Sequence, residues 1–447
     1  MPVLKRKEFI ETSGERFSLL VDENGIPDFW ITLFMTTVVR SYTHSTQRAY
    51  ISHLYHLSLW EAKIKARLSD RIITASQNKS SNNIRFFSHS EVQSIAEHCK
   101  LQTKTARKLN DSNNKVIQFK KPTSKAPLAT VSIAQQNQRI KVISEYFEFL
   151  ANNLLRNKAS FSSYVAIIKE TKELLLSKKS KGGSRRTTFD PDAKAPPPEV
   201  FSEVMELVRP LNHKNPFTKL VKNRNYLLFR LLYETGLRSG EILQLKITDI
   251  KFSQNLIEIR RKHDDLEDTY RSIEPNAKTL ERDIPITSEL SEEIRSYVIQ
   301  ERPLISNANK HSFLFVSHKG TSSGNPISLI QFSKIVEKVA EDENLADFIK
   351  KYGFKGAKRI TRHGFRHDFN NRLSISIDKN NEKAREEGRL HDVISEKKEL
   401  ENRMYLMGHK HESSSSIYNL RHTKKQAESL LLQEMRKMDF LINPKDD

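Results

Sequence analysis

Four short stretches of the chain carry residue types that could act on a phosphate diester. They are "TGLRSGEILQL" with Arg238 and Glu241, "AKTLERDIPI" with Lys278, "TRHGFRHDF" with His363, Arg366 and His367, and "MGHKHESSSSIY" with His409 and Tyr418. Cutting a diester by in-line attack requires a nucleophile, positive charge beside the non-bridging oxygens and a proton for the leaving oxygen. Tyrosine, arginine and lysine or histidine side chains can meet these needs.

Two arginines are suited to hold the phosphate. Arg238 follows Gly236, where a helix is expected to end. Arg366 lies three residues after His363, so both side chains share one face of a helix. Guanidinium groups bind phosphate oxygens in bidentate fashion and stay charged. We therefore predict that Arg238 and Arg366 clamp one phosphate from two sides.

Tyr418 is the candidate nucleophile. A free phenol has a pKa of about 10, so it needs a nearby base and a positive field to react at neutral pH. His363 and the two arginines would supply these. The serine run before Tyr418 is expected to lead into the helix that presents it, with His409 at the other end of that run.

Metal-dependent alternatives are weaker. His363 and His367 have the i, i+4 spacing that can bind zinc, but the glutamate of a metalloprotease motif is absent and no third ligand is evident. The "HKH" at 409 to 411 is weaker still, and no carboxylate cluster suits magnesium. We expect neither a metal nor another cofactor.

The ordered set of four stretches resembles the tyrosine recombinase, or phage integrase, family. The resemblance covers residues from about 199 to 435 well and reaches the amino half more loosely. It implies a site-specific DNA recombinase that cleaves DNA without metal or ATP. Its nucleophile would form a 3′-phosphotyrosyl bond and free a 5′ hydroxyl, which later attacks a partner strand.

The resemblance also implies a role for each residue. Lys278 would protonate the leaving oxygen, although Lys262 competes for that role because the loop between the two expected strands is long. The remaining roles are phosphate binding for Arg238, Arg366 and His409, general base for His363, nucleophile for Tyr418, and support for Glu241, which would hold Arg238, and for His367.

Composition favours a polyanionic partner. Lys and Arg total 75 against 55 Asp and Glu, a net charge of +20, which suits neutralisation of phosphates along double-stranded DNA. A single cysteine, Cys99, excludes an internal disulfide framework. The apolar run at 226 to 233 is too short to span a bilayer, so we expect a cytoplasmic protein.

The expected fold is mainly α with a small antiparallel β-sheet, in two domains that clamp DNA. Residues 1–27 would be an extension, 28–176 a helical core-binding domain and 199–435 the catalytic domain, with a charged insertion at about 376–400 and a tail at 436–447. The basic, proline-rich segment 177–198 reads as a linker. Its Arg185 and Arg186 are candidate DNA contacts.

Local patterns support this division. Apolar residues at helical spacing fill residues 45–68 and 132–155, whereas "NLIEIRRK" and "ERDIPIT" alternate as two strands do. A helix ending at Gly236 is followed by a second helix that begins near Ser239.

Assembly and biological task are open at this stage. The resemblance implies four protomers on two DNA duplexes, with possible accessory proteins, and the apolar face of the helix near 427–442 fits docking either on its own domain or on a neighbouring protomer. A type IB topoisomerase-like enzyme and a catalytically silent architectural protein are the alternatives. A mobile genetic element is the expected setting.

Overall fold

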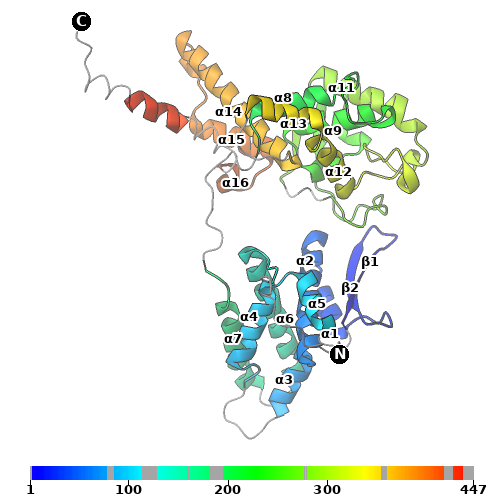
Figure 1. Ribbon diagram of the computed structural model, residues 1–447, viewed down its shortest axis with the longest axis vertical. Coiled ribbons are helices and arrows are strands. Elements are labelled where there is room, and N and C mark those ends of the chain that lie inside the picture. Colours follow the sequence, from blue (N-terminus) through cyan, green and yellow to red (C-terminus); the bar gives the residue numbers. More distant parts are fainter. Residues whose placement is uncertain are drawn as a thin grey trace, which may run out of the picture. The chain divides into compact units, whose positions relative to one another are not determined.

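The computed structural model describes residues 3–77, 85–112, 128–158, 161–181, 195–275, 277, 279–353, 360–416 and 426–435. Lys278, Tyr418, Arg185 and Arg186 lie outside the described residues. The chain divides into two compact units, Met1–Thr187 and Thr188–Asp447, each with its own hydrophobic core (Figure 1). The boundary falls within residues 177–198, the predicted linker.

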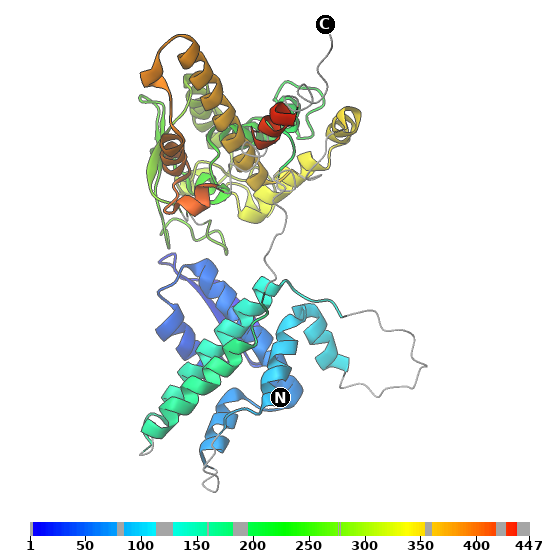
Figure 2. The same ribbon diagram turned by 90° about the vertical axis from the view of Figure 1, so that its left-hand side faces the viewer.

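Unit 1 is a helical bundle with a β-hairpin. Its long helices, α2 and α6, begin where the sequence indicates: α6 has Ser132 as its N-cap, whose side chain accepts from the Gln135 amide. Figure 2 shows α6 and α7 side by side. The elements are β1 (Lys5–Ile10), β2 (Arg16–Val21), α1 (Phe29–Phe34), η1 (Met35–Val39), α2 (His44–Ile64), α3 (Leu68–Gln77), α4 (His89–Lys100), α5 (Thr103–Ser112), α6 (Ile133–Leu155) and α7 (Phe161–Ser177).

The hairpin of β1 and β2 was not foreseen from the sequence. The two strands pair antiparallel, from Lys5 opposite Val21 to Ile10 opposite Arg16. Leu20 is fully buried and belongs to the core of unit 1. The hairpin is therefore packed on the helices of unit 1, because one of its faces supplies apolar side chains to their core.

Unit 2 combines helices with one three-stranded antiparallel sheet in the order β3, β4, β5. The two strands expected from alternation pair directly, with Ile257 opposite Ile284, which confirms that prediction. The elements up to the sheet and its following helix are α8 (Pro198–Leu207), η3 (Lys219–Val221), α9 (Lys222–Thr235), α10 (Ser239–Gln244), η4 (Ile247–Asp249), β3 (Ile250–Lys251), β4 (Leu256–Ile259), β5 (Arg282–Pro285), α11 (Ser288–Ser296) and η5 (Tyr297–Glu301).

Helices make up the rest of unit 2. The region expected as a charged insertion, about 376–400, is the second half of α14, the turn after it and the start of α15. The elements are η6 (Arg302–Leu304), η7 (Ala308–Lys310), η8 (Gly320–Ser322), α12 (Leu329–Ala340), α13 (Glu343–Tyr352), α14 (Arg362–Glu386), η9 (Leu390–Asp392), α15 (Glu396–Met407) and α16 (Glu412–Ser416), followed by a helix at 426–435.

An aromatic cluster holds α8, α9 and α14 together. The Phe365 ring packs edge-on against Phe201 at 4.8 Å between centroids and lies 5.7 Å from Phe229. All three side chains are fully buried. Since Arg366 follows Phe365, this packing fixes the position of the first turn of α14.

The fold class is confirmed: the chain is mainly helical with small antiparallel sheets. None of the helices in the described ranges has an apolar stretch of the length that a bilayer requires.

Candidate active site

Arg238 lies in a tight junction between two helices. Helix α9 ends at Gly236, which has φ of 60° and was the expected end of that helix. A Cβ on Gly236 would lie 2.7 Å from the Phe369 ring of α14. Glycine is thus required both for the left-handed turn and for the close approach of α14. Two residues later, Arg238 is the N-cap of α10, with its side chain partly buried.

Arg366 enters the same region from α14. It is 1% exposed, and its guanidinium donates from Nη1 to the Gly236 carbonyl at 2.9 Å and from Nη2 to the Met407 carbonyl at 2.7 Å. Arg238 also donates to Met407 O, from Nη1 at 3.2 Å. The two arginines, 128 positions apart in the chain (366 − 238), therefore share one carbonyl acceptor.

His409 joins the two arginines. Its Nε2 lies 3.2 Å from Nη2 of Arg238 and 3.1 Å from Nη2 of Arg366. Because a guanidinium can only donate, Nε2 must be the acceptor and carry no proton. The neutral ring then has its proton on Nδ1, which lies 2.7 Å from Oγ of Ser415. The arginines thus determine the tautomer of His409, and Oγ of Ser415 accepts from its Nδ1–H.

The electrostatics agree with a neutral imidazole. Burial, followed by the positive charges of Arg366 and Arg238, lowers the pKa of His409 to about 4. In this arrangement His409 Nε2 occupies the position of an acceptor between two cationic groups. An oxygen of a phosphate diester would satisfy the same donors with a negative charge.

Glu241 supports Arg238 through the backbone. Its Oε2 accepts from the Arg238 amide at 2.7 Å, and its ionic partner is Arg282, with Nη1 3.0 Å from Oε1. Both side chains are buried. Burial alone would raise the pKa of Glu241, but the charge and hydrogen bonds of Arg282 bring it below its usual value. The sequence indicated the support of Arg238 but not Arg282.

The structure distinguishes the surroundings of the two candidate lysines. The ammonium of Lys262 lies 2.5 Å from Oδ2 of Asp249 and is engaged in that ion pair. Lys278 lies outside the described residues, but its neighbours Ala277 and Thr279 are buried. Thr279 donates to Oε1 of Glu241, so the chain beside Lys278 reaches the group that supports Arg238.

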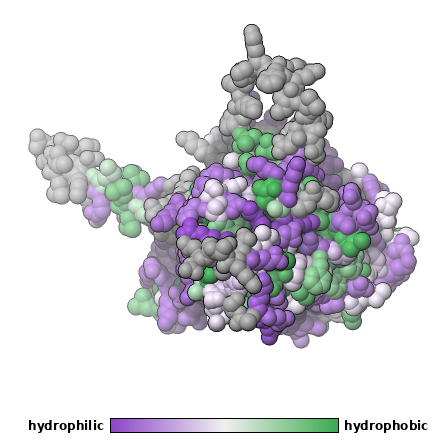
Figure 3. Space-filling view, turned by 90° about the horizontal axis from the view of Figure 1, so that it is seen from below, coloured by the Kyte–Doolittle hydropathy of each residue, from purple (hydrophilic) through white to green (hydrophobic). Residues whose placement is uncertain are grey.

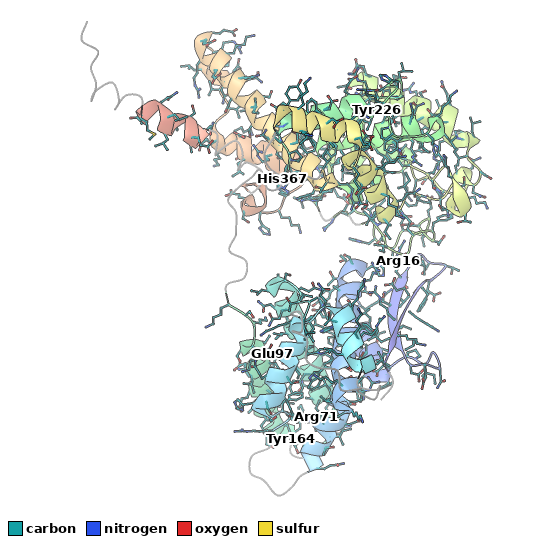
Figure 4. The ribbon with its side chains drawn as sticks, viewed as in Figure 1. Arg16, Arg71, Glu97, Tyr164, Tyr226 and His367 are labelled. Carbon is teal, nitrogen blue, oxygen red and sulfur yellow. The ribbon has the colours of Figure 1, made fainter. Side chains whose placement is uncertain are left out.

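His363 and His367 lie on the first two turns of α14. Their rings meet edge to face, with centroids 4.9 Å apart. His363 is exposed and His367, labelled in Figure 4, is partly buried. Within the described ranges no three His, Cys, Asp or Glu side chains gather in a metal-binding group.

A cavity of about 760 Å³ lies elsewhere in unit 2. It is lined by residues from the start of α9 and from α11 and η5, including Tyr226 (labelled in Figure 4), Glu293 and Tyr297. None of the predicted site residues that the structure describes lines it. Its position near the amino end of α9, away from Gly236, separates it from the arginine pair.

Sequence reasoning missed three residues of this site. Arg282 and Thr279 bind Glu241, and Ser415 binds His409. Arg282 lies in "AKTLERDIPI", the stretch that the sequence singled out for Lys278 alone. Ser415 is one of four consecutive serines, and nothing local distinguishes it from the other three.

Comparison with known proteins relates part of the chain to one family. Residues 203–376 match the model of the phage integrase family. This range includes Arg238 and Arg366 and ends before His409 and Tyr418. The chain is 26% identical over 217 residues to the tyrosine recombinase XerD of Halalkalibacterium halodurans, covering 48% of this chain and 61% of the relative.

Mobile-element proteins are also similar. Transposase A from transposon Tn554 of Staphylococcus aureus is 25% identical over 264 residues, or 57% of this chain and 66% of the relative. The chain thus spans three fifths to two thirds of the length of these relatives. The Tn1549 transposon integrase in complex with circular intermediate DNA aligns at a TM-score of 0.45 and 14% identity, covering 90% of this chain and 99% of that chain.

Residues 203–376 are thus similar to the phage integrase family, and the chain is similar to tyrosine recombinases. The resemblance inferred from the four stretches is therefore confirmed.

Proposed function

We propose that the protein is a site-specific DNA recombinase that cleaves and exchanges strands through a 3′-phosphotyrosyl intermediate. The observation that carries this proposal is the convergence of Arg238, Arg366 and His409 on one point. Two cationic groups there share a neutral acceptor that a phosphate oxygen can replace. Double-stranded DNA is the proposed substrate, in keeping with the net charge of +20.

Each chemical step has a proposed residue. Tyr418 Oη attacks the scissile phosphorus and forms the new P–O bond, while His363 accepts the phenolic proton. Arg238 and Arg366 bind the non-bridging oxygens, and His409 joins them once its Nε2 carries a proton that it can donate. Lys278 gives its proton to the departing 5′ oxygen. His367 supports the first turn of α14. Arg185 and Arg186 of the linker are proposed contacts to the DNA backbone.

Assembly into a tetramer on two DNA sites is part of the proposal. The helix at 426–435 supports it because four large apolar side chains, Leu430, Leu431, Leu432 and Met435, are each more than half exposed. Figure 3 shows hydrophobic side chains on the surface of this segment, at the left of the view. Exposed large apolar side chains of this kind are typical of a segment that binds another chain.

Covalent trapping tests the proposed function. Wild type and Tyr418→Phe are incubated in EDTA with nicked duplexes that cover the DNA flanking the gene. The expected result is an adduct that resists denaturant in wild type alone. A second variant, Tyr405→Phe, changes an exposed tyrosine on α15 and should form the adduct as wild type does.

The outcomes separate the candidate functions. Tight binding without an adduct would contradict cleavage and favour an architectural protein. An adduct in Tyr418→Phe would assign the nucleophile elsewhere. An adduct that is resolved only by rejoining the same strand, with relaxation of supercoils by monomers, would favour a type IB topoisomerase-like enzyme.

A further inference from the structure

Helices α14 and α15 meet largely through polar side chains on one face of each helix. The residues are Arg366, Asn370 and Ser374 of α14 and Glu399, Arg403 and Met407 of α15. Within each helix they are spaced four positions apart, and side chains at that spacing lie on the same face. Arg366 at the start of α14 bonds to the end of α15, whereas Ser374 bonds to Glu399 near its beginning. The helices are therefore antiparallel along this contact.

Arg403 is the centre of the contact between α14 and α15. Its side chain is only 1% exposed. Nη1 lies 3.2 Å from Oδ1 of Asn370, and Nη2 lies 2.6 Å from Oγ of Ser374. Glu399, one turn earlier on α15, is its ionic partner. Because the donors of a guanidinium lie in a rigid plane, Arg403 reaches these partners together at one register of α15 against α14.

Arg403 also determines the orientation of the Asn370 amide, which is fully buried. Oδ1 of Asn370 must face the guanidinium, since a guanidinium can only donate. The amide nitrogen Nδ2 then donates to the Arg366 carbonyl at 2.7 Å and to Sδ of Met407 at 3.2 Å. One amide thus joins the backbone of Arg366 to the side chain of Met407.

Met407 connects this contact to the two arginines of the candidate site. It is the last residue of α15, so its carbonyl oxygen has no donor within the helix. That oxygen accepts from Nη2 of Arg366 at 2.7 Å and from Nη1 of Arg238 at 3.2 Å. The carboxyl end of a helix is the negative end of its dipole and favours cations. The register of α15 therefore decides where the two guanidinium groups, which repel each other, can lie side by side.

We propose that Asn370 and Arg403 are positioning residues: they hold the Met407 carbonyl at the place where it directs both arginines of the site to one phosphate. This inference rests on the proposed function. Neither residue contacts the phosphate in the proposal. Each acts through α15, because a buried polar network whose groups have partners rigidifies the elements that it joins.

The charge of the phosphate provides a specific readout. When Tyr418 Oη bonds to phosphorus and the P–O5′ bond breaks, both non-bridging oxygens of a diester carry negative charge. A methylphosphonate has a methyl group in place of one of these oxygens and is neutral. The same bonds form and break, but the arginines have less negative charge to stabilise. A defect in placing the arginines is therefore smaller on the methylphosphonate, whereas a loss of folded protein slows the reaction with both substrates equally.

The test measures single-turnover formation of the covalent adduct on nicked duplexes that carry either a phosphate or a methylphosphonate at the scissile position. Asn370→Leu replaces the amide by an apolar side chain of similar size. Arg403→Lys keeps the ion pair with Glu399 but lacks the planar fork that reaches Asn370 and Ser374 together. Both should react with the phosphate about 10- to 100-fold more slowly than wild type, because small displacements of catalytic groups slow reactions by up to about 10²-fold. On the methylphosphonate both should stay within about 3-fold of wild type.

Two further variants calibrate the readout. Arg238→Ala should show the largest difference between the two substrates, because it removes one guanidinium directly. Asn381→Leu makes the matched change eleven positions further along α14 (381 − 370). Asn381 bonds there to the amide of Ile394 at 2.8 Å and to its carbonyl at 2.9 Å, away from the arginines. This variant should keep the wild-type ratio of the two rates.

The results separate failure of the inference from failure of the proposed function. The positioning role would be overturned if Asn370→Leu reacted with the phosphate at the wild-type rate, or if it were equally slow on both substrates. Arg403→Lys gives the same decision if Asn370→Leu does not fold. A wild-type protein that forms no adduct on the phosphate would instead refute the proposed function.

Discussion

We predict that the His409 ring is neutral in the free protein and gains a proton more readily when DNA binds. In the free protein the ring should be neutral, with its proton on Nδ1, because Nε2 accepts from Arg238 and Arg366. Its pKa of about 4 lies about 2.5 units below an ordinary histidine. That shift corresponds to about 3 kcal/mol in favour of the neutral form and about 300-fold less protonation at a given pH.

Phosphate should reverse this shift. A diester held between the arginines contributes a negative charge next to the ring and replaces Nε2 as their acceptor, so the pKa of His409 should rise when DNA binds. Because the free-protein pKa is below that of the unfolded chain, the neutral histidine stabilises the fold above about pH 6.5. This contribution is lost as the pH falls toward 4.

Long-range ¹H–¹⁵N correlation spectra of protein labelled at histidine measure the pKa and the tautomer of His409 in the free and DNA-bound protein. The variant His409→Gln assigns its signals. Tyr418→Phe bound to a duplex containing the cleavage site provides the uncleaved complex. Ser415→Ala should weaken the preference for the Nδ1–H tautomer, whereas Ser413→Ala, an exposed serine of the same run, should preserve it. The reasoning would be refuted if His409 of the free protein titrated at the ordinary histidine pKa of about 6.5, or if its neutral ring carried the proton on Nε2.

Four other predictions concern stability and assembly. Gly408→Ala should destabilise unit 2 by about 2 kcal/mol in urea unfolding, because φ is 62° and Thr279 leaves no room for Cβ; an unchanged midpoint would contradict this close contact. Arg282→Met should lower the unfolding free energy by about 3 to 5 kcal/mol, because it leaves Glu241 charged and buried. The double variant with Glu241→Gln should lose less than the two single variants together. Additive losses would argue against coupling between Arg282 and Glu241. Unit 1 should lose stability from pH 6.5 toward 4, because burial lowers the pKa of His44, His53 and His98 to about 4 and of His56 to about 3. Each of these histidines adds up to about 1.4 kcal/mol per pH unit to the loss of unfolding free energy. Fluorescence of Trp30 and Trp60, both in unit 1, would follow the unfolding. Leu431→Asp should reduce assembly on DNA in light scattering but not DNA binding by the monomer, whereas unchanged assembly would exclude this helix from the interface.

Local sequence patterns predicted much of the architecture. Gly236 marks the end of α9 because the left-handed turn there favours glycine, and alternation in "NLIEIRRK" and "ERDIPIT" predicted the pairing of β4 with β5. The β1–β2 hairpin escaped prediction. Its inward face has few apolar residues, and burial against α2 and its neighbours, rather than local periodicity, makes it part of unit 1.

The candidate site divides in the same way. Residue type and local spacing were enough to single out Arg238 and Arg366 as candidates for binding one phosphate, and the family resemblance added His409. Only the tertiary structure decided which atoms meet: that both arginines donate toward Nε2 of His409, that Ser415 holds its Nδ1, and that Arg282 is the ionic partner of Glu241. The periodicity of helices and strands depends on neighbouring residues and can be read from the sequence. Hydrogen-bond partners 41 to 171 positions apart meet only when the whole unit packs.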